Sequence, residues 1–216
     1  MNNKRFELII FDWDGTLMDS TRTITQAIQA SCRELGFRSP SDKAAQDVIG
    51  LSITEAFKVA CPEATVDDYP KLIAAYQRHF GQDQIPLFDG VFDGLNQLQQ
   101  MGFFLAVATG KGRTGLNTAL DKSNTRTLFD TTRTVTECAS KPNPEMIFSI
   151  CDELSIAPNK ALMVGDTTYD LQMAHNAGAY AAALTTGAHN ESQLAQVPYL
   201  SLNHSFHDFL GWLVQQ

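Results

Sequence analysis

Short apolar runs recur along the chain, and each ends abruptly at polar or small residues. They cover Leu8–Phe11, Phe103–Ala108, Ala161–Val164 and Tyr180–Leu184. Such nearly continuous runs are typical of strands that are buried on both faces of a parallel sheet. Helical patterns lie between them, at Gly90–Gln100, Pro144–Leu154 and Thr167–Asn176. The alternation predicts an α/β fold, a Rossmann-like doubly wound parallel sheet with helices on both faces.

The segment from residue 20 to residue 81 breaks this alternation, because it carries helical patterns and no strand pattern. One pattern starts after Ser20, which is a candidate N-cap. A second starts after Ser52, which forms a capping-box pattern with Glu55. A third starts at Tyr69. These patterns indicate an all-helical insertion rather than a further part of the sheet.

The chain is therefore predicted to form two domains. A helical cap would occupy residues 18–82, and an α/β core would consist of residues 1–17 and 83–216. Linkers near residues 17–20 and 81–88 would join the two and let the cap move over the core.

The net charge and the cysteine spacing of the chain limit the partners and the cellular location that we expect. The net charge is −8, whereas proteins that bind nucleic acid or anionic membranes need clustered Lys and Arg side chains. We therefore expect no nucleic-acid partner and no membrane partner. The N-terminus lacks the apolar stretch of a signal peptide, and the four cysteines form no C-x-x-C pair. These features predict a cytoplasmic protein, and they leave open whether it is a monomer or a homodimer.

Ligands of open α/β sheets bind at the carboxyl ends of the strands, so the residues after each apolar run are candidate site residues. They are Asp12 and Asp14 after the first run, Thr109, Gly110 and Lys111 after the second, and Asp166 and Asp170 after the third. Lys141 lies in the turn "ASKPNPE", whose prolines disfavour helical geometry in the residues before them.

These side chains have one coherent chemical use. Several carboxylates at one edge of a sheet repel each other unless a divalent cation lies among them, and an all-oxygen set suits Mg²⁺. Lys141 and the hydroxyl of Thr109 could then hold phosphate oxygens. An Asp beside such a metal can act as a covalent nucleophile on phosphorus. Gly15 would let backbone N–H groups turn toward the phosphate.

Four segments carry a resemblance to a known family. They are "DWDGT" at 12–16, the Thr after a strand at 109, "SKPNPE" with Lys141, and "GDTTYD" at 165–170. In type and in order, they resemble the four motifs of the haloacid dehalogenase-like (HAD) superfamily, over nearly the whole chain. The helical insertion is similar to the C1 cap of its phosphoglycolate phosphatase-like branch. Trp13 departs from that branch, in which Leu, Met or Phe is usual, and its ring could pack against its neighbours or narrow the site.

The resemblance implies a role for each catalytic position. Asp12 would be the nucleophile that forms an aspartyl-phosphate. Asp14 would protonate the leaving alkoxide and then activate the water that hydrolyses the intermediate. Thr109, Gly110 and Lys141 would bind the substrate, and Thr109 and Lys141 would also stabilise the phosphoryl group during its transfer.

The resemblance also implies a metal site for Mg²⁺. Its ligands would be the carboxylates of Asp12 and Asp166 and the backbone carbonyl of Asp14, with Asp170 acting mainly through a neighbouring ligand. The implied activity is the Mg²⁺-dependent hydrolysis of a small phosphate monoester, a phosphorylated metabolite.

The substrate is less constrained than the reaction. Phosphoglycolate is favoured by the resemblance alone, while nucleoside monophosphates, sugar phosphates and pyrophosphate stay open. Specificity is expected to reside in the cap loops, with Arg22 and the "IGLS" loop around Gly50 as candidates, although Arg22 could equally be a solvated helix residue.

Three other activities fit part of the sequence. A β-phosphoglucomutase-like phosphotransferase would keep all four motifs and stays open. A dehalogenase would need neither Asp14 nor the metal, so the acidic residues argue against it. A dinucleotide-binding oxidoreductase could use the G-x-G-x-x-G pattern of Gly110, Gly112 and Gly115 with Asp130, but that interpretation leaves the acidic pairs unexplained.

Overall fold

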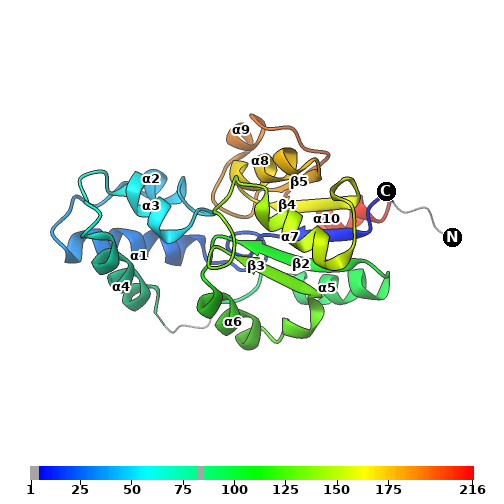
Figure 1. Ribbon diagram of the computed structural model, residues 1–216, viewed down its shortest axis with the longest axis horizontal. Helices are drawn as coiled ribbons and strands as arrows, with labels where there is room; N and C mark the ends of the chain where they lie inside the picture. The colour runs from blue at the N-terminus through cyan, green and yellow to red at the C-terminus, as the bar shows by residue number, and fades with distance from the viewer. Residues whose placement is uncertain (1–4, 82–84) are drawn as a thin grey trace.

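The computed structural model describes residues 5–81 and 85–216. Within these residues, a six-stranded parallel sheet has helices on both faces (Figure 1). The strand order is β3-β2-β1-β4-β5-β6. The strands are β1 (Leu8–Phe11), β2 (Phe104–Thr109), β3 (Thr131–Thr134), β4 (Ala161–Gly165), β5 (Tyr180–Leu184) and β6 (Leu202–Asn203). The predicted Rossmann-like doubly wound sheet is confirmed.

The helices of the core follow the strands in sequence. They are α5 (Val91–Gln100), α6 (Arg113–Lys122), α7 (Glu145–Leu154), α8 (Thr168–Ala177), α9 (Glu191–Leu194) and α10 (Phe206–Leu213). Short 3-10 turns, η1 (Arg126–Leu128) and η2 (Pro158–Lys160), precede β3 and β4. The predicted core helices agree with α5, α7 and α8 to within one residue at each end, whereas α6 and α10 lie outside the predicted patterns.

The two faces of the sheet bury alternate residues of the same strands, as the two-residue repeat of a strand requires. On one face, Ile9 and Phe11 of β1 pack against α5, α6 and α10. On the other face, Leu8 and Ile10 pack against α7 and α8. Both layers are buried, which explains why these runs are apolar throughout rather than alternating.

β1 lies at the centre of the sheet and pairs with β2 on one side and β4 on the other. The chain builds one half of the sheet through β2 and β3 and then crosses to β4, so β1 and β4 form the switch point of the topology. The backbone N–H of Asp12 continues this pairing by donating to the carbonyl of Val164 over 3.0 Å. The carboxyl ends of β1 and β4 are therefore held side by side, where such sheets bind ligands.

Helices α1 (Thr21–Glu34), α2 (Asp42–Gln46), α3 (Ile53–Ala60) and α4 (Tyr69–Phe80) form a separate group at one end of the molecule (Figure 1). They have a hydrophobic cluster of their own, which includes Ile28, Phe57 and Leu72. No strand interrupts them within residues 20–81, as predicted.

The two connections of this group run alongside each other. The N–H of Asp19 donates to the carbonyl of Pro86 over 3.0 Å, and the N–H of Phe88 donates to the carbonyl of Leu17 over 2.9 Å. The division into cap (18–82) and core (1–17 and 83–216) stays a prediction, since part of the second linker lies outside the described residues.

Two predictions about helix starts need correction. Ser20 precedes α1, but its side chain makes no cap; its Oγ donates to Asp14 instead, over 2.7 Å. Ser52 accepts from the N–H of Glu55 over 3.2 Å, but the reciprocal half of the capping box is missing. The carboxylate of Glu55 binds Lys58 at 2.6 Å, because an i,i+3 cation on the same helix competes for it.

The pattern of apolar runs also missed two strands. β3 has the sequence TTRT and lies at one edge of the sheet, and β6 lies at the other edge and contains two residues. Edge strands need fewer apolar residues than central strands do, so neither stands out as an apolar run. Within the described residues, no helix has the length and the apolar character needed to cross a membrane.

Candidate active site

Asp12 is the first residue after β1, and its side chain is buried at the edge of the sheet. Its Oδ1 accepts from the N–H of Trp13 over 2.6 Å and lies 2.8 Å from Nζ of Lys141. Its Oδ2 is buried and has no hydrogen-bond partner. Because a buried carboxylate oxygen without a partner is costly, Oδ2 is the atom of this site that most clearly needs a ligand.

Lys141 brings a positive charge into the same buried space. The side chain is only 2% exposed, and its Nζ lies 2.6 Å from Oδ1 of Asp170 as well as contacting Asp12. Burial alone would lower the pKa of Lys141, but the negative charges of Asp12 and Asp170 outweigh it and raise that pKa. Lys141 therefore stays protonated.

Asp170 has a second partner on its own helix. Its Oδ2 accepts from both the N–H and the Oγ1 of Thr167, at 3.1 Å and 2.7 Å, and this completes a capping box at the start of α8. Asp170 thus caps α8 and contacts Lys141 at the same time. This capping box holds the carboxylate of Asp170 so that its other oxygen, Oδ1, faces Lys141.

Asp166 follows β4, and its carboxylate lies so close to the neighbouring backbone that two adjacent positions must be glycine. Its Oδ1 accepts from Oγ1 of Thr16 over 2.6 Å, and its Oδ2 accepts from the N–H of Ala188 over 2.8 Å. A Cβ on Gly15 would lie 2.5 Å from Oδ2, and Gly15 also has a φ of +81°, which favours glycine. A Cβ on Gly187 would lie 1.9 Å from the same oxygen.

Three carboxylates thus gather at the switch point. Asp12, Asp166 and Asp170, here called the acidic cluster, each offer an oxygen within 4.8 Å of the others. Burial raises the pKa of Asp12 well above its usual value, and the nearby Asp170 and Asp166 raise it further while Lys141 lowers it. Burial and the charge of Asp170 raise the pKa of Asp166 to about 7.

The acidic cluster has the properties of a site for a hard cation. Lys141 supplies one positive charge against three carboxylates, and burial, followed by repulsion from the neighbouring carboxylates, raises the pKa values of Asp12 and Asp166. The donors are all oxygens, which suits Mg²⁺. The unpartnered Oδ2 of Asp12 is one such donor.

Asp14 faces away from the acidic cluster, toward the helical group. Its Oδ1 accepts from Oγ of Ser20, and its Oδ2 lies 3.0 Å from Nζ of Lys111. Nζ of Lys111 also lies 4.7 Å from the centre of the Phe80 ring, a cation–π contact with the end of α4. Asp14 thus faces the helical group, whereas Asp12 belongs to the acidic cluster.

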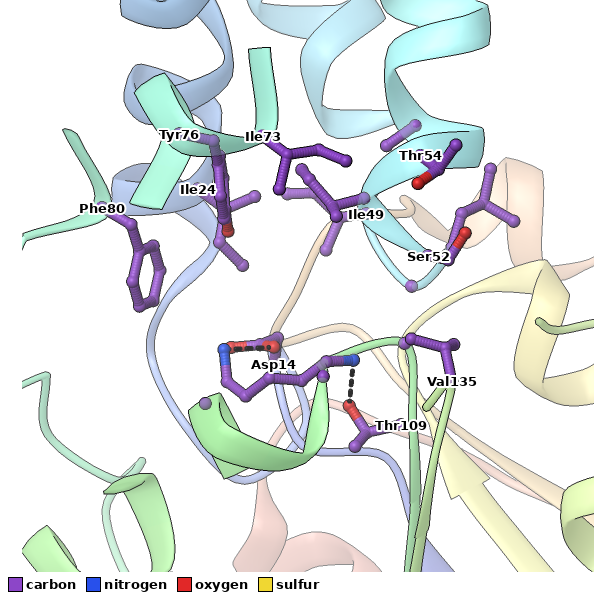
Figure 2. Close-up of a pocket in the computed structure, with 18 of the residues that line it drawn as sticks. Asp14, Ile24, Ile49, Ser52, Thr54, Ile73, Tyr76, Phe80, Thr109 and Val135 are labelled. Carbon is purple, nitrogen blue, oxygen red and sulfur yellow. Dashed lines mark hydrogen bonds and ion pairs between the residues drawn. The ribbon is translucent and has the colours of Figure 1, made fainter. Parts of the chain in front are cut away.

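Thr109 ends β2 beside this pair, and its Oγ1 accepts from the N–H of Lys111 over 3.1 Å (Figure 2). Gly110 lies directly under the loop that contains Gly50 and Leu51, here called the cap loop. A Cβ there would lie 2.5 Å from the carbonyl oxygens of both Gly50 and Leu51. The glycine is therefore required for the close approach of cap and core, whatever it contributes to substrate binding.

A cavity of about 580 Å³ lies between the core and the helical group. Its floor consists of Asp12, Asp14, Thr109 and Lys111, and Gly110, Gly112 and the first residues of α6 form one wall. We use the word floor for those four residues. Ser52 at the start of α3 lines the opposite side and donates its N–H to Oγ of Ser140 over 2.9 Å.

The roof of the cavity, defined as the lining residues of α1, α3, α4 and the 48–52 loop, is mainly apolar. Ile24, Ile49, Ile73, Tyr76 and Phe80 point from it toward the floor in Figure 2. The "IGLS" loop is part of this roof, and its role in specificity stays a prediction. Arg22 is exposed and does not line the cavity, which favours the solvated alternative.

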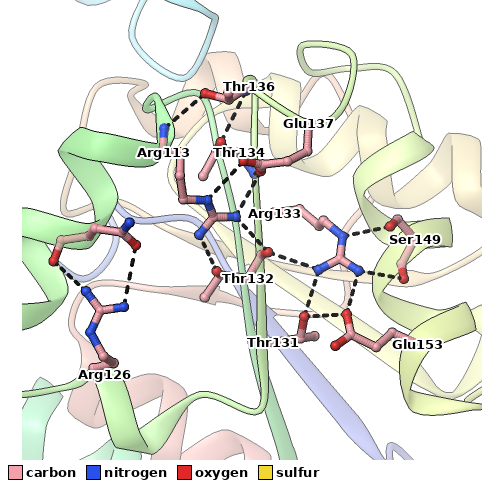
Figure 3. A network of polar contacts seen from close by, with 11 residues as sticks. Arg113, Arg126, Thr131, Thr132, Arg133, Thr134, Thr136, Glu137, Ser149 and Glu153 are labelled. Carbon is pink, nitrogen blue, oxygen red and sulfur yellow. Dashed lines mark hydrogen bonds and ion pairs between the residues drawn. The ribbon is translucent and has the colours of Figure 1, made fainter.

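A polar network behind the cavity holds the chain that leads to Lys141 (Figure 3). Arg113, at the start of α6, binds both carboxylate oxygens of Glu137 and the carbonyl of Thr132. Glu137 also accepts from the N–H and hydroxyl of Thr134. Hydrogen bonds from Arg113 are the main reason that the pKa of Glu137 falls to about 2.

Two further predictions are settled by these positions. The ring of Trp13 is fully buried against Phe129 in the core, so it packs there and does not line the cavity. Asp130, the acidic residue of the dinucleotide pattern, accepts from the N–H of Leu105 at the start of β2. It therefore lies at the end of the sheet away from the site and is not available to a ribose there, so the dinucleotide-binding interpretation is wrong.

Sequence reasoning missed the roles of two residues. The sequence places Lys111 at a strand end, directly after Thr109-Gly110, but indicates no function for it. The sequence predicts Ser20 only as the N-cap of a helix. Nothing in the local sequence indicates that both side chains meet Asp14, because these contacts depend on how the first linker passes over the end of β2.

Comparisons with known proteins agree with this geometry. A family model described as haloacid dehalogenase-like hydrolase matches residues 9–184, a range that contains every site residue from Asp12 to Asp170. A protein of Dickeya dadantii named "Probable phosphatase IndB" is 32% identical, over 94% of this chain and 92% of its own. The pyrophosphatase PpaX of Bacillus velezensis is 29% identical, over 85% of each chain.

A solved structure from Haemophilus somnus 129Pt, described as a predicted phosphoglycolate phosphatase, is similar along its whole length. It is 25% identical, with a TM-score of 0.86 over 100% of both chains. Both the core and the helical group therefore have counterparts in a known structure.

Proposed function

The chain belongs to the haloacid dehalogenase-like hydrolase family as a phosphoric monoester hydrolase, and we propose that it cleaves a small phosphate monoester with Mg²⁺ through an aspartyl-phosphate. The predicted resemblance to this family is confirmed. The observation that carries the proposal is the buried meeting of Asp12, Lys141, Asp166 and Asp170 at one strand-end edge, with Asp14 alongside.

The first step would use Asp12 and Asp14 in different roles. A carboxylate oxygen of Asp12 attacks phosphorus, and the bond from phosphorus to the ester oxygen breaks. Asp14, on the cap side, gives a proton to the leaving alkoxide, so that a neutral alcohol departs. Lys141 and Thr109 are placed beside Asp12 to stabilise charge on the phosphoryl oxygens.

The second step would return the enzyme to its starting state. Asp14, now a carboxylate, takes a proton from water, and the water oxygen attacks phosphorus. The bond from phosphorus to Asp12 breaks, which releases inorganic phosphate. Ser20 and Lys111 hold the carboxylate of Asp14 at the cavity floor, where both the alcohol and the water must lie.

The acidic cluster would hold Mg²⁺, with the backbone carbonyl of Asp14 as a further ligand. The ion would supply positive charge that binds a phosphate oxygen and offsets the charge of the nucleophile. The fit rests on the oxygen donors and the unpartnered Oδ2 of Asp12.

The similar proteins do not agree on a substrate. One is named a pyrophosphatase, and the solved structure is described as a phosphoglycolate phosphatase. Phosphoglycolate, favoured by the predicted branch, is therefore one of several compounds to assay. The mutase alternative stays open, as do the cytoplasmic location and the choice between monomer and homodimer.

The test is a measurement of released phosphate with a panel of monoesters, with Mg²⁺ and with EDTA. We expect turnover of at least one compound, its loss in EDTA, and its loss in Asp12→Asn, which keeps the shape of the side chain but removes the nucleophile.

Turnover that survives in Asp12→Asn would refute the nucleophile, and turnover in EDTA would refute the metal. A compound that is isomerised without release of phosphate would favour the mutase alternative. Circular dichroism of Asp12→Asn should match that of the unsubstituted protein, which excludes unfolding as the cause of its inactivity.

A further inference from the structure

We propose that the alcohol released from the substrate is uncharged and largely apolar, such as an alcohol that carries an aromatic ring. The inference rests on the proposed phosphatase function and names the substrate class for the same site. It differs from the substrates of the named relatives, because phosphoglycolate carries a carboxylate and pyrophosphate carries a second phosphate.

The roof would face the leaving group, because the floor holds the groups that act on phosphorus. Isoleucines 24, 49 and 73 contribute apolar surface, and Tyr76 and Phe80 contribute aromatic surface. Among the residues that the structure describes, no charged side chain of the cap lines the cavity. Its polar side chains there are neutral: Ser52, Thr54, Gln77 and the hydroxyl of Tyr76.

The cations that do line the cavity come from the core, and both are already paired. Nζ of Lys111 lies 3.0 Å from the carboxylate of Asp14 and over the ring of Phe80. Arg113 forms a two-point ion pair with Glu137 and also donates to Thr132. Both cations are thus already held by carboxylates of the core, and each would have to leave its partner to neutralise a second anionic group on a substrate.

A charged leaving group would therefore lose water without gaining a counter-charge. Burying an anion against isoleucines is costly, and the carboxylate of Asp12 would add repulsion. An apolar group in the same place gains free energy in proportion to the area that it removes from water.

The size of the cavity also favours a leaving group larger than a two-carbon acid. Cavities of roughly 300–1,000 Å³ hold ligands with many more atoms than a two-carbon acid, and this one measures about 580 Å³. The rings of Tyr76 and Phe80 are stacked with their centres 5.6 Å apart, and both line the cavity. They add aromatic surface to the roof, which an apolar leaving group can contact.

The first experiment compares three alkyl phosphates in the presence of Mg²⁺: benzyl phosphate, ethyl phosphate and phosphoglycolate. All three are esters of primary alcohols. Ethyl phosphate matches phosphoglycolate in carbon number but lacks its carboxylate. We expect kcat/KM to be highest for benzyl phosphate, at least about tenfold above ethyl phosphate because of the buried ring, and lowest for phosphoglycolate. Pyrophosphate should be a poor substrate as well.

The second experiment adds a cation to the roof. Ile73→Lys places a charge on α4 where the side chain is half-buried, so the long stem can be accommodated. We expect the ratio of kcat/KM for phosphoglycolate to that for benzyl phosphate to rise by about tenfold. Val59→Lys is the matched control, because it adds the same charge to the cap at an exposed position outside the cavity.

The outcomes separate this inference from the proposed function. A wild-type preference for phosphoglycolate or pyrophosphate, or a ratio that changes no more in Ile73→Lys than in Val59→Lys, would overturn the inference and leave the phosphatase standing. Failure to release phosphate from every compound would overturn both.

Discussion

The floor of the cavity holds charged and polar side chains in a hydrogen-bond network, whereas the roof presents mainly apolar side chains. The contacts in the floor and beneath it are hydrogen bonds and ion pairs between defined atoms, and the single side chain of Lys141 links two carboxylates. In the roof, contacts are non-directional and depend on shape. Under the proposed function, this difference would separate two tasks: the core would position the groups that act on phosphorus, and the cap would select the alcohol that fits above them.

This contrast also predicts how the two regions respond to substitution. Removing one member of a buried charged network leaves its partners uncompensated, which is costly. Removing part of an apolar wall mostly changes the volume available. Core substitutions should therefore affect every substrate, and roof substitutions should affect some substrates more than others.

The largest effect is expected for Lys141→Met. It removes the cation that lies between Asp12 and Asp170, so kcat should fall by about 10²–10³-fold for every substrate. The free energy of unfolding should fall by about 3–5 kcal/mol, because buried carboxylates lose their partner. Steady-state kinetics and urea unfolding measure the two effects.

Lys160→Met is the control for this change, since Lys160 is a partly exposed lysine whose Nζ lies 3.8 Å from Oε1 of Glu7. It should alter neither quantity appreciably. An activity loss in Lys141→Met that appeared with only one substrate would contradict the assignment of Lys141 to the shared chemistry.

An intermediate effect is expected for Gly110→Ala, at the junction of floor and roof. The added Cβ would meet the carbonyl oxygens of Gly50 and Leu51 at 2.5 Å, so the cap loop must move away. Displacement of about 1 Å can cost as much as about 100-fold in rate, and we expect kcat/KM to fall by about 10- to 100-fold.

Gly112→Ala is the matched control in the same loop. A Cβ there meets only Oγ1 of Thr136, at 3.8 Å, so the loss should be much smaller. Equal losses in the two variants would show that the loop itself, and not its contact with the cap, is sensitive to added bulk.

The smallest effect concerns Glu137, which holds the chain behind the floor. Its pKa falls from 4.5 to about 2 on folding, so its charged form stabilises the folded state. That stabilisation is fully present above pH 4.5 and is lost as the pH falls toward 2. The urea midpoint of the unsubstituted protein should exceed that of Glu137→Gln near neutral pH, with a gap that narrows in acid.

Glu7→Gln, at an exposed position in the same domain, serves as the reference and should show a small gap at every pH. A gap between the unsubstituted protein and Glu137→Gln that stayed constant from neutral pH down to pH 2 would contradict the role of the carboxylate charge in the network around Arg113.

The acidic cluster could be predicted from the sequence because it depends on local rules. Asp12 directly follows an apolar run, Asp166 follows another after Gly165, and parallel strands bring their carboxyl ends to one edge. Lys141 could be included because its turn precedes a helix that packs on the same sheet. The edge strand β3 escaped prediction, because its threonines do not form an apolar run.

The order of apolar runs and helical patterns determined, without the structure, a doubly wound core, a helical insertion and a set of candidate site residues at the strand ends. Hydrophobic periodicity and strand-end position are properties of neighbouring residues, so a sequence displays them directly. Only the tertiary structure decided that Lys111 and Ser20 hold Asp14, that Gly110 lies under the cap loop, and that the roof lacks charge. These features arise where the insertion folds back over the sheet, and such a contact between distant segments depends on packing that no local pattern records.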